Sequence, residues 1–95
     1  TDPETGTPFA TPEFWNATFI GNDGSRTITF RDNAGGAYAN GIFTGFGQGI
    51  DIEDLEDQTQ DSYRQFQDGN LNLLNNVFFN IAAGNSASDI FTVSN

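Results

Sequence analysis

Residues 38–46 read YANGIFTGF, and related stretches stand at residues 14–21 (FWNATFIG) and 73–81 (LLNNVFFNI). Aligned on the first asparagine of each stretch, the copies share two columns, which are Asn16, Asn40 and Asn75, and then Phe19, Phe43 and Phe78. A turn rich in Gly and Asn follows each copy, and a second β-branched run follows each turn. Three copies of strand, turn and strand in 95 residues indicate a stacked repeat.

A repeat of this kind buries its inner face only by stacking. Coils about 4.8 Å apart pair each strand with its copies above and below, which forms parallel sheets. The phenylalanine column then stacks inside the solenoid, while the residues before it, Thr18, Ile42 and Val77, point to the other side of the strand. The asparagine column is expected at a corner, as an amide ladder whose side chains bond to one another and whose backbone is left-handed.

We therefore predict an all-β fold, a right-handed parallel β-helix segment of about three coils. The expected strands cover residues 14–20, 27–31, 37–43, 49–53, 70–79 and 89–93. The alternative is a β-sandwich of about seven short strands, which does not explain the columns. Residues 1–12 hold all the prolines and form an extended N-terminal segment. Residues 13–95 form one solenoid segment, which we expect to belong to a longer chain.

Residues 53–68 interrupt the repeat with an acidic and polar stretch. Leu55, Thr59, Tyr63 and Phe66 recur there at helical spacing, and a glycine that could end a helix follows at residue 69. The same residues are consistent with a loop that is held by its two aromatic side chains. The sequence leaves both interpretations open, a short helix or an acidic loop.

Charge and composition exclude several classes of partner. Thirteen acidic residues stand against three Arg, with no Lys, His or Cys, and the formal net charge is −10. Binding to nucleic acid needs clustered basic side chains, so we expect no nucleic acid partner. No apolar run is long enough to span a bilayer, so we expect no membrane insertion. Without disulfides, stability has to come from packing, bound ions or neighbours.

Four segments together resemble a known family, and they are NATFIG (16–21), FRDNAG (30–35), GIDIED (49–54) and GNL (69–71). They are similar to segments of large β-helical surface proteins exported by type IX secretion, whose body is similar to the pectate-lyase-type solenoid. The resemblance implies the same β-helical fold and an extracellular or outer cell-surface location. It implies no catalytic residue, because the shared motifs are fold motifs and members of this kind are mostly uncharacterised.

The densest acidic cluster lies at residues 51–61. Carboxylates of Asp51, Glu53, Asp54 and Asp57 could bind Ca²⁺, which takes about six to eight oxygen ligands. Their spacing matches neither the EF-hand nor the glycine-rich nonapeptide repeat. The alternative is a solvated acidic loop that keeps the edge of the sheet soluble. Apart from this candidate calcium, we predict no cofactor.

No cluster of residues requires a catalytic function. Asp51, Asp54 and Arg31 are the groups that a solenoid lyase or glycosidase would use. A chain with a net charge of −10 repels polyanionic uronates, and no basic cluster accompanies Arg31. We therefore predict no catalytic residue, and expect Arg31 to pair locally with a carboxylate.

Aromatic residues suggest a sugar-binding alternative. Trp15, Tyr38 and Phe46 could form an exposed stripe on which sugar rings stack, or they could cover the flank of the solenoid. We predict a non-catalytic structural or adhesive scaffold of a secreted or cell-surface protein, whose partners are further coils of the same chain or stacked copies. One alternative is a carbohydrate-binding or polysaccharide-cleaving β-helix module. The other is a subunit of an envelope complex or of a self-stacking filament.

Overall fold

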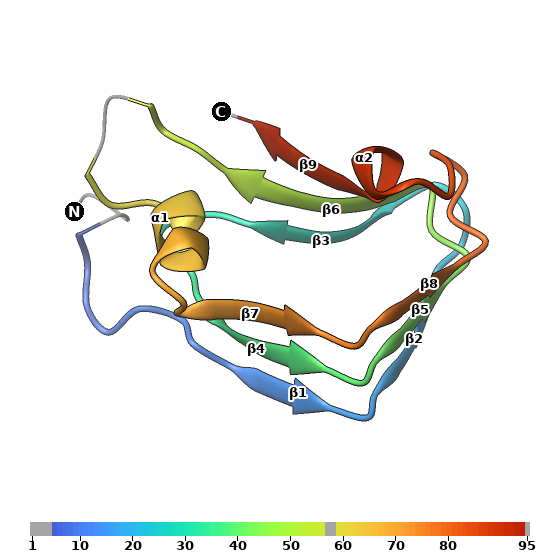
Figure 1. Ribbon diagram of the computed structural model, residues 1–95, viewed down its shortest axis with the longest axis horizontal. Coiled ribbons are helices and arrows are strands. Elements are labelled where there is room, and N and C mark those ends of the chain that lie inside the picture. The colour runs from blue at the N-terminus through green and yellow to red at the C-terminus, as the bar shows by residue number, and fades with distance from the viewer. Residues whose placement is uncertain (1–4, 57–58, 95) are drawn as a thin grey trace.

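A computed structural model of the protein describes residues 5–56 and 59–94, which form nine strands and two helices (Figure 1). The strands are β1 (Glu13–Trp15), β2 (Thr18–Ile20), β3 (Arg26–Phe30), β4 (Gly36–Ala39), β5 (Ile42–Thr44), β6 (Gln48–Glu53), β7 (Leu71–Leu74), β8 (Val77–Phe79) and β9 (Phe91–Ser94). The helices are α1 (Ser62–Gln67) and α2 (Ala87–Ile90). Strands therefore dominate the described chain, which confirms the predicted all-β class.

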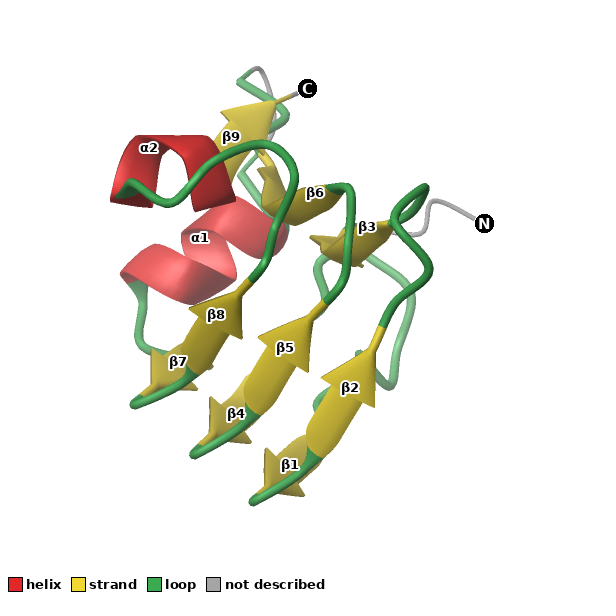
Figure 2. Cartoon of the chain, turned by 90° about the vertical axis from the view of Figure 1, so that its right-hand side faces the viewer, coloured by secondary structure: helices red, strands yellow, loops and turns green. Residues whose placement is uncertain are grey.

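The strands form three parallel sheets, β1-β4-β7, β2-β5-β8 and β3-β6-β9. The chain passes through the three sheets in the same order three times, and each circuit lies beside the next (Figure 2). The register keeps the expected columns, since Phe43 pairs with Phe19 on one side and with Phe78 on the other. Every pairing among these described strands is parallel, whereas a β-sandwich is built from antiparallel sheets. The sandwich alternative is therefore wrong.

An asparagine divides each of the three longer strands that the sequence predicts. Asn16, Asn40 and Asn75 have φ angles of 59°, 56° and 56°, in the left-handed region that short polar residues tolerate. The chain turns at each of them, so the segments before and after the asparagine belong to different sheets. A circuit consequently contains three short strands, where the sequence predicts one long strand and a second run.

The corner asparagines do not form the predicted amide ladder. Their side chains are exposed, and within the described part of the chain no hydrogen bond joins one amide to the next. Backbone hydrogen bonds join the circuits at this corner instead, since the N–H of Asn40 donates to the carbonyl oxygen of Leu74 (2.9 Å). The amide of Asn76 supplies the side-chain bonds, accepting from the N–H of Gly41 (2.8 Å) and donating to the carbonyl of Tyr38 (2.9 Å).

Substitutions of Asn40 separate the effect of backbone conformation from that of the amide. We expect Asn40→Val to lower the free energy of unfolding by about 1–2 kcal/mol, because a β-branched residue is strained at positive φ. Asn40→Gly should stay within about 0.5 kcal/mol of the wild type, since glycine adopts this conformation freely. Both variants lose the amide, and urea denaturation compares them. Equal destabilisation would assign the role of Asn40 to its side chain.

The core lies inside the circuits. The rings of Phe19 and Phe43 stack with their centroids 5.1 Å apart, and those of Phe43 and Phe78 are also 5.1 Å apart. Ile50 is fully buried in the middle strand of the third sheet, where it packs with Leu71 and other apolar side chains. Residues that precede the phenylalanines face solvent, as strand alternation predicts. The periodic columns of the sequence are thus the layers of the core.

Residues 53–68 contain both of the structures that the sequence leaves open, because a loop after β6 leads into helix α1. The carboxylate of Asp61, the N-cap of α1, accepts hydrogen bonds from the backbone N–H of Arg64 (2.7 Å) and of Leu55 (2.7 Å). Of the four residues at helical spacing, only Tyr63 and Phe66 lie in the helix. One buried carboxylate therefore closes the loop and starts the helix.

Helix α2 overlaps the start of the last predicted strand, residues 89–93, so strand β9 begins only at Phe91. The N-cap of α2 is a capping box, in which the hydroxyl of Ser86 accepts from the N–H of Asp89 and the carboxylate of Asp89 accepts from the N–H of Ser86 (both 3.2 Å). The hydrogen bonds from Ser86 hold the pKa of Asp89 below its ordinary value. Neither of the helices in the described residues is long and apolar enough to cross a membrane.

Candidate functional site

The three described carboxylates of the predicted calcium site, Asp51, Glu53 and Asp54, bond to separate partners. Asp51 accepts hydrogen bonds from the hydroxyls of Thr92 (2.7 Å) and Ser94 (2.6 Å) on β9. Glu53 is buried, and its Oε2 lies 2.6 Å from Nη2 of Arg31, so the predicted local pairing of this arginine is present. The first set of bonds joins the second circuit to the third, and the ion pair joins the second circuit to the first.

Asp54 forms an ion pair with Arg64, whose Nη1 also lies 2.6 Å from Oδ2 of Asp61. The pKa of the Arg64 guanidinium is raised, chiefly by its hydrogen bond to Asp54. Within residues 5–56 and 59–94, no group of three or more His, Cys, Asp or Glu side chains is placed to hold a metal ion. Asp57 lies outside the described residues, so the calcium site stays a prediction.

Of the two alternatives for Trp15, Tyr38 and Phe46, an exposed stripe is not present, because Trp15 and Tyr38 point to opposite faces of their sheet. Trp15 is 56% exposed, whereas Phe46 is half-buried. Tyr38 pairs in register with Phe14 on the inner face, where their rings stack at 5.4 Å, and it meets the ring of Phe30 edge-on at 5.2 Å. Burial raises the pKa of the Tyr38 hydroxyl. Tyr38 is therefore a core residue, and Trp15 is left as the exposed ring.

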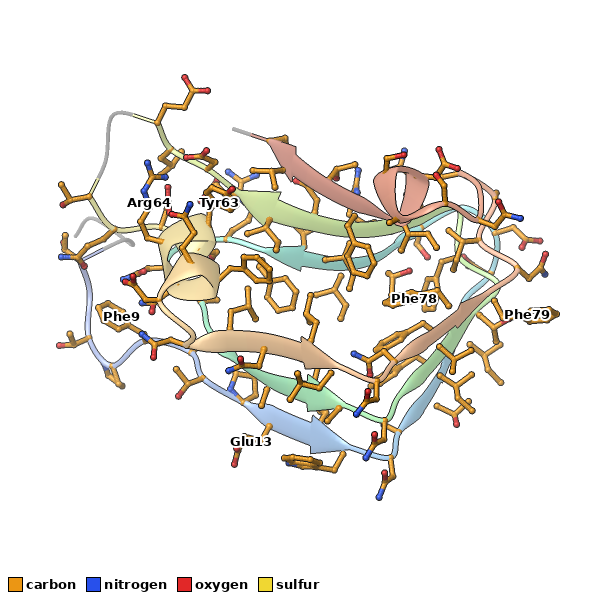
Figure 3. The ribbon with its side chains drawn as sticks, in the orientation of Figure 1. Phe9, Glu13, Tyr63, Arg64, Phe78 and Phe79 are labelled. Atoms are coloured by element: carbon orange, nitrogen blue, oxygen red, sulfur yellow. The ribbon has the colours of Figure 1, made fainter. Side chains whose placement is uncertain are left out.

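A groove lies on the outer face of sheet β1-β4-β7. Glu13, Ala37 and Asn72 stand in register across the three strands, and Figure 3 shows Glu13 pointing away from the interior of the circuits. The small side chain of Ala37 leaves a trough between a carboxylate and an amide whose strands lie about 10 Å apart. The trough is part of a groove of about 610 Å³. Further lining side chains are those of Phe9, Gln65 and Asn70.

Residues 5–12, the described part of the N-terminal segment, form one end of the groove. The N–H of Gly35 donates to the carbonyl of Ala10, and the N–H of Ala37 donates to that of Pro12 (both 2.9 Å), which holds the segment beside β4. Gly36, at φ 117°, permits this approach, because a Cβ there would lie 2.3 Å from the Pro12 oxygen. The segment thereby brings the ring of Phe9 to the groove.

Amide side chains form the wall that belongs to the third circuit. Nε2 of Gln65 donates to Oδ1 of Asn33 (2.8 Å), and Nδ2 of Asn70 donates to Oε1 of Gln65 (2.9 Å). Nδ2 of Asn72 donates to the carbonyl of Gly69 (2.8 Å). A second groove of about 340 Å³ adjoins the first and shares Gln65 and Asn70 with it. These bonds fix the amides in place, so the wall is a preformed polar surface.

An apolar platform continues the outer face beyond the trough. Trp15, Ala39 and Leu74 stand in register there, one column closer to the asparagine corner. Ala39 is 3% exposed although it points outward, because the two larger side chains cover it while remaining largely exposed themselves. The face therefore combines a polar trough with an exposed indole ring.

The neighbouring outer face, on sheet β2-β5-β8, is apolar and shallow. Ile20 is 79% exposed, and Figure 3 shows Phe79 pointing away from the molecule. Thr44 lies between them in register on the middle strand. Among the strands of these two sheets, Glu13 is the single charged residue, although the whole chain has a net charge of −10. The acidic residues are therefore concentrated on the third side of the molecule and in its loops.

Comparison of the chain with protein-family models, with curated proteins and with solved structures finds no match. The resemblance to β-helical proteins exported by type IX secretion stays a prediction, and the groove has to be interpreted from its own residues. This groove was not predicted from the sequence. The sequence does contain one sign of it, which is the placement of Ala37 and Ala39 in columns of the repeat whose other members are large.

Proposed function

We propose that the chain is a segment of a right-handed parallel β-helix, which serves as a non-catalytic structural and adhesive scaffold in a secreted or cell-surface protein. The observation that carries the proposal is the unbroken register, in which one order of three strands repeats three times. Parallel strands joined by crossover connections are right-handed in about 98% of cases, which supports the hand.

The polar side chains support a structural role, because many of them join neighbouring circuits. Arg31 and Glu53 link the first circuit to the second, and Asp51 and Thr92 link the second to the third. The export of the protein is supported by the resemblance of its fold motifs to the type IX family.

Hydrogen exchange on the purified chain tests the scaffold. The backbone groups of β4, β5 and β6 are paired on both sides, so we expect their amides to open in one cooperative step. Their free energies of opening should agree within about 1 kcal/mol. Separate opening of a single sheet would contradict a continuous scaffold. Release of reducing ends from a polysaccharide, abolished by Asp51→Asn, would contradict the non-catalytic assignment.

A further inference from the structure

We propose that the groove over β4, together with the platform at Trp15, binds a segment of an uncharged polysaccharide chain. This binding site deepens the proposed adhesive role and rests on the stacked scaffold, because the trough exists only where strands of three successive circuits are in register. Its two walls come from β1 and β7, and its floor is Ala37 of the middle strand. No single circuit contains the site.

The backbone of β4 excludes recognition of an added peptide strand at this face. As the middle strand of its sheet, β4 pairs with β1 on one side and with β7 on the other. Strand addition needs a sheet edge with unpaired N–H and C=O groups. A ligand lying over Ala37 therefore has to be recognised by side chains. The polar side chains that line the groove are the amides of Gln65, Asn70 and Asn72, the hydroxyl of Thr11 and the carboxylate of Glu13.

These side chains match the hydroxyl-rich surface of a sugar. Amides donate to and accept from hydroxyl groups, and a carboxylate accepts from them. The fixed amides of Gln65 and Asn70 need little ordering on binding. Aromatic rings offer flat apolar contact to the C–H face of a sugar ring, and Phe9 and Trp15 lie at either end of the polar stretch. Along this face, an aromatic ring at each end therefore flanks a central row of polar side chains.

Charge and area select the ligand further. The net charge of −10 disfavours polyanions such as uronates. Glu13 is the one charged side chain in the described lining, so the groove offers no series of charges to a polycation either, which favours an uncharged polysaccharide. The walls of the trough stand on strands about 10 Å apart, which is too narrow to seat the broad surface of roughly 800 Å² per partner that a stable protein complex buries. A narrow linear chain can follow it, whereas a second protein surface gains little there.

Affinity electrophoresis of the full chain tests the proposal, with a soluble uncharged β-glucan and a galactomannan in the gel and polygalacturonate as the polyanion. We expect an uncharged polymer to retard the wild type. Ala37→Leu fills the floor of the trough and should weaken apparent affinity about tenfold, as should Trp15→Ala. Since Trp15 is the only tryptophan, its fluorescence reports binding in the wild type and in Ala37→Leu independently.

Thr44→Leu is the matched control, because Thr44 holds the equivalent middle position on the outer face of β2-β5-β8. It should bind as the wild type does. Equal retardation of Ala37→Leu and the wild type would overturn the proposal, as would retardation by polygalacturonate alone or by none of the polymers. If binding is absent while β4, β5 and β6 still exchange cooperatively, the ligand assignment fails and the scaffold stands.

Discussion

Replacing Phe43 with alanine is expected to lower the free energy of unfolding by about 3–5 kcal/mol. Phe43 is 2% exposed, and its ring stacks between those of Phe19 and Phe78 at 5.1 Å on each side. Its removal opens a cavity in the middle of the column, and the circuits above and below cannot close that cavity without breaking the register. Small domains are stable by only about 5–15 kcal/mol, so the loss is a large share of the total.

Urea denaturation followed by circular dichroism measures this effect. Ile42→Ala is the matched control, since Ile42 precedes Phe43 on the same strand but points outward and is exposed. Its loss should stay below about 1 kcal/mol. Phe19→Ala should fall between the two, because Phe19 lies at the end of the column and is half-buried. If Phe43→Ala costs no more than Ile42→Ala, the aromatic column does not hold the circuits together.

Asp61→Ala is expected to lower the free energy of unfolding by about 3 kcal/mol, the second large effect. The Asp61 side chain is fully buried and accepts hydrogen bonds from two backbone N–H groups, those of Leu55 and Arg64. Loss of an N-cap costs about 1 kcal/mol, and a buried donor left without a partner costs about 1–3 kcal/mol more. The alanine variant suffers both losses.

Asp68→Ala is the control for this prediction, because Asp68 is an exposed aspartate at the opposite end of α1. We expect a change within about 0.5 kcal/mol. Hydrogen exchange would show whether the loss at Asp61 is confined to α1 or spreads into the neighbouring strand β7. An unchanged unfolding free energy in Asp61→Ala would show that α1 opens independently of the sheets.

The stacked repeat was predictable because its signal is periodic and local. The spacing from Asn16 to Phe19 recurs from Asn40 to Phe43 and from Asn75 to Phe78. Each copy therefore predicts the same residues for the inner and the outer face of its strand. The left-handed corner at the asparagine column was also predicted, but the expected strands run across it, because one residue with positive φ changes the direction of the chain without interrupting the apolar pattern. The sequence consequently predicts long strands where the structure has pairs of short ones.

The groove could not be predicted, because it depends on contacts between residues far apart in the chain. The repeat already places Ala37 in one column with Glu13 and Asn72, but it does not show that their outward side chains form a trough. One end depends on the N-terminal segment, which reaches β4 through backbone hydrogen bonds that carry no side-chain pattern. Tyr38 was misassigned for a related reason, since an aromatic residue in a strand belongs to either face until the register is known.

The unequal circuits show where this architecture can accept new sequence. Glu13 and Ala37 are 24 positions apart, whereas Ala37 and Asn72 are 35 apart (37 − 13 and 72 − 37), yet all three stand in one column. The longer circuit contains the loop after β6 and helix α1, both of which lie outside the sheets. Insertions at this connection leave the strand register intact. The connection from β8 to β9 is lengthened in the same way by helix α2, so this architecture accepts new sequence between its strands while the strand register stays uniform.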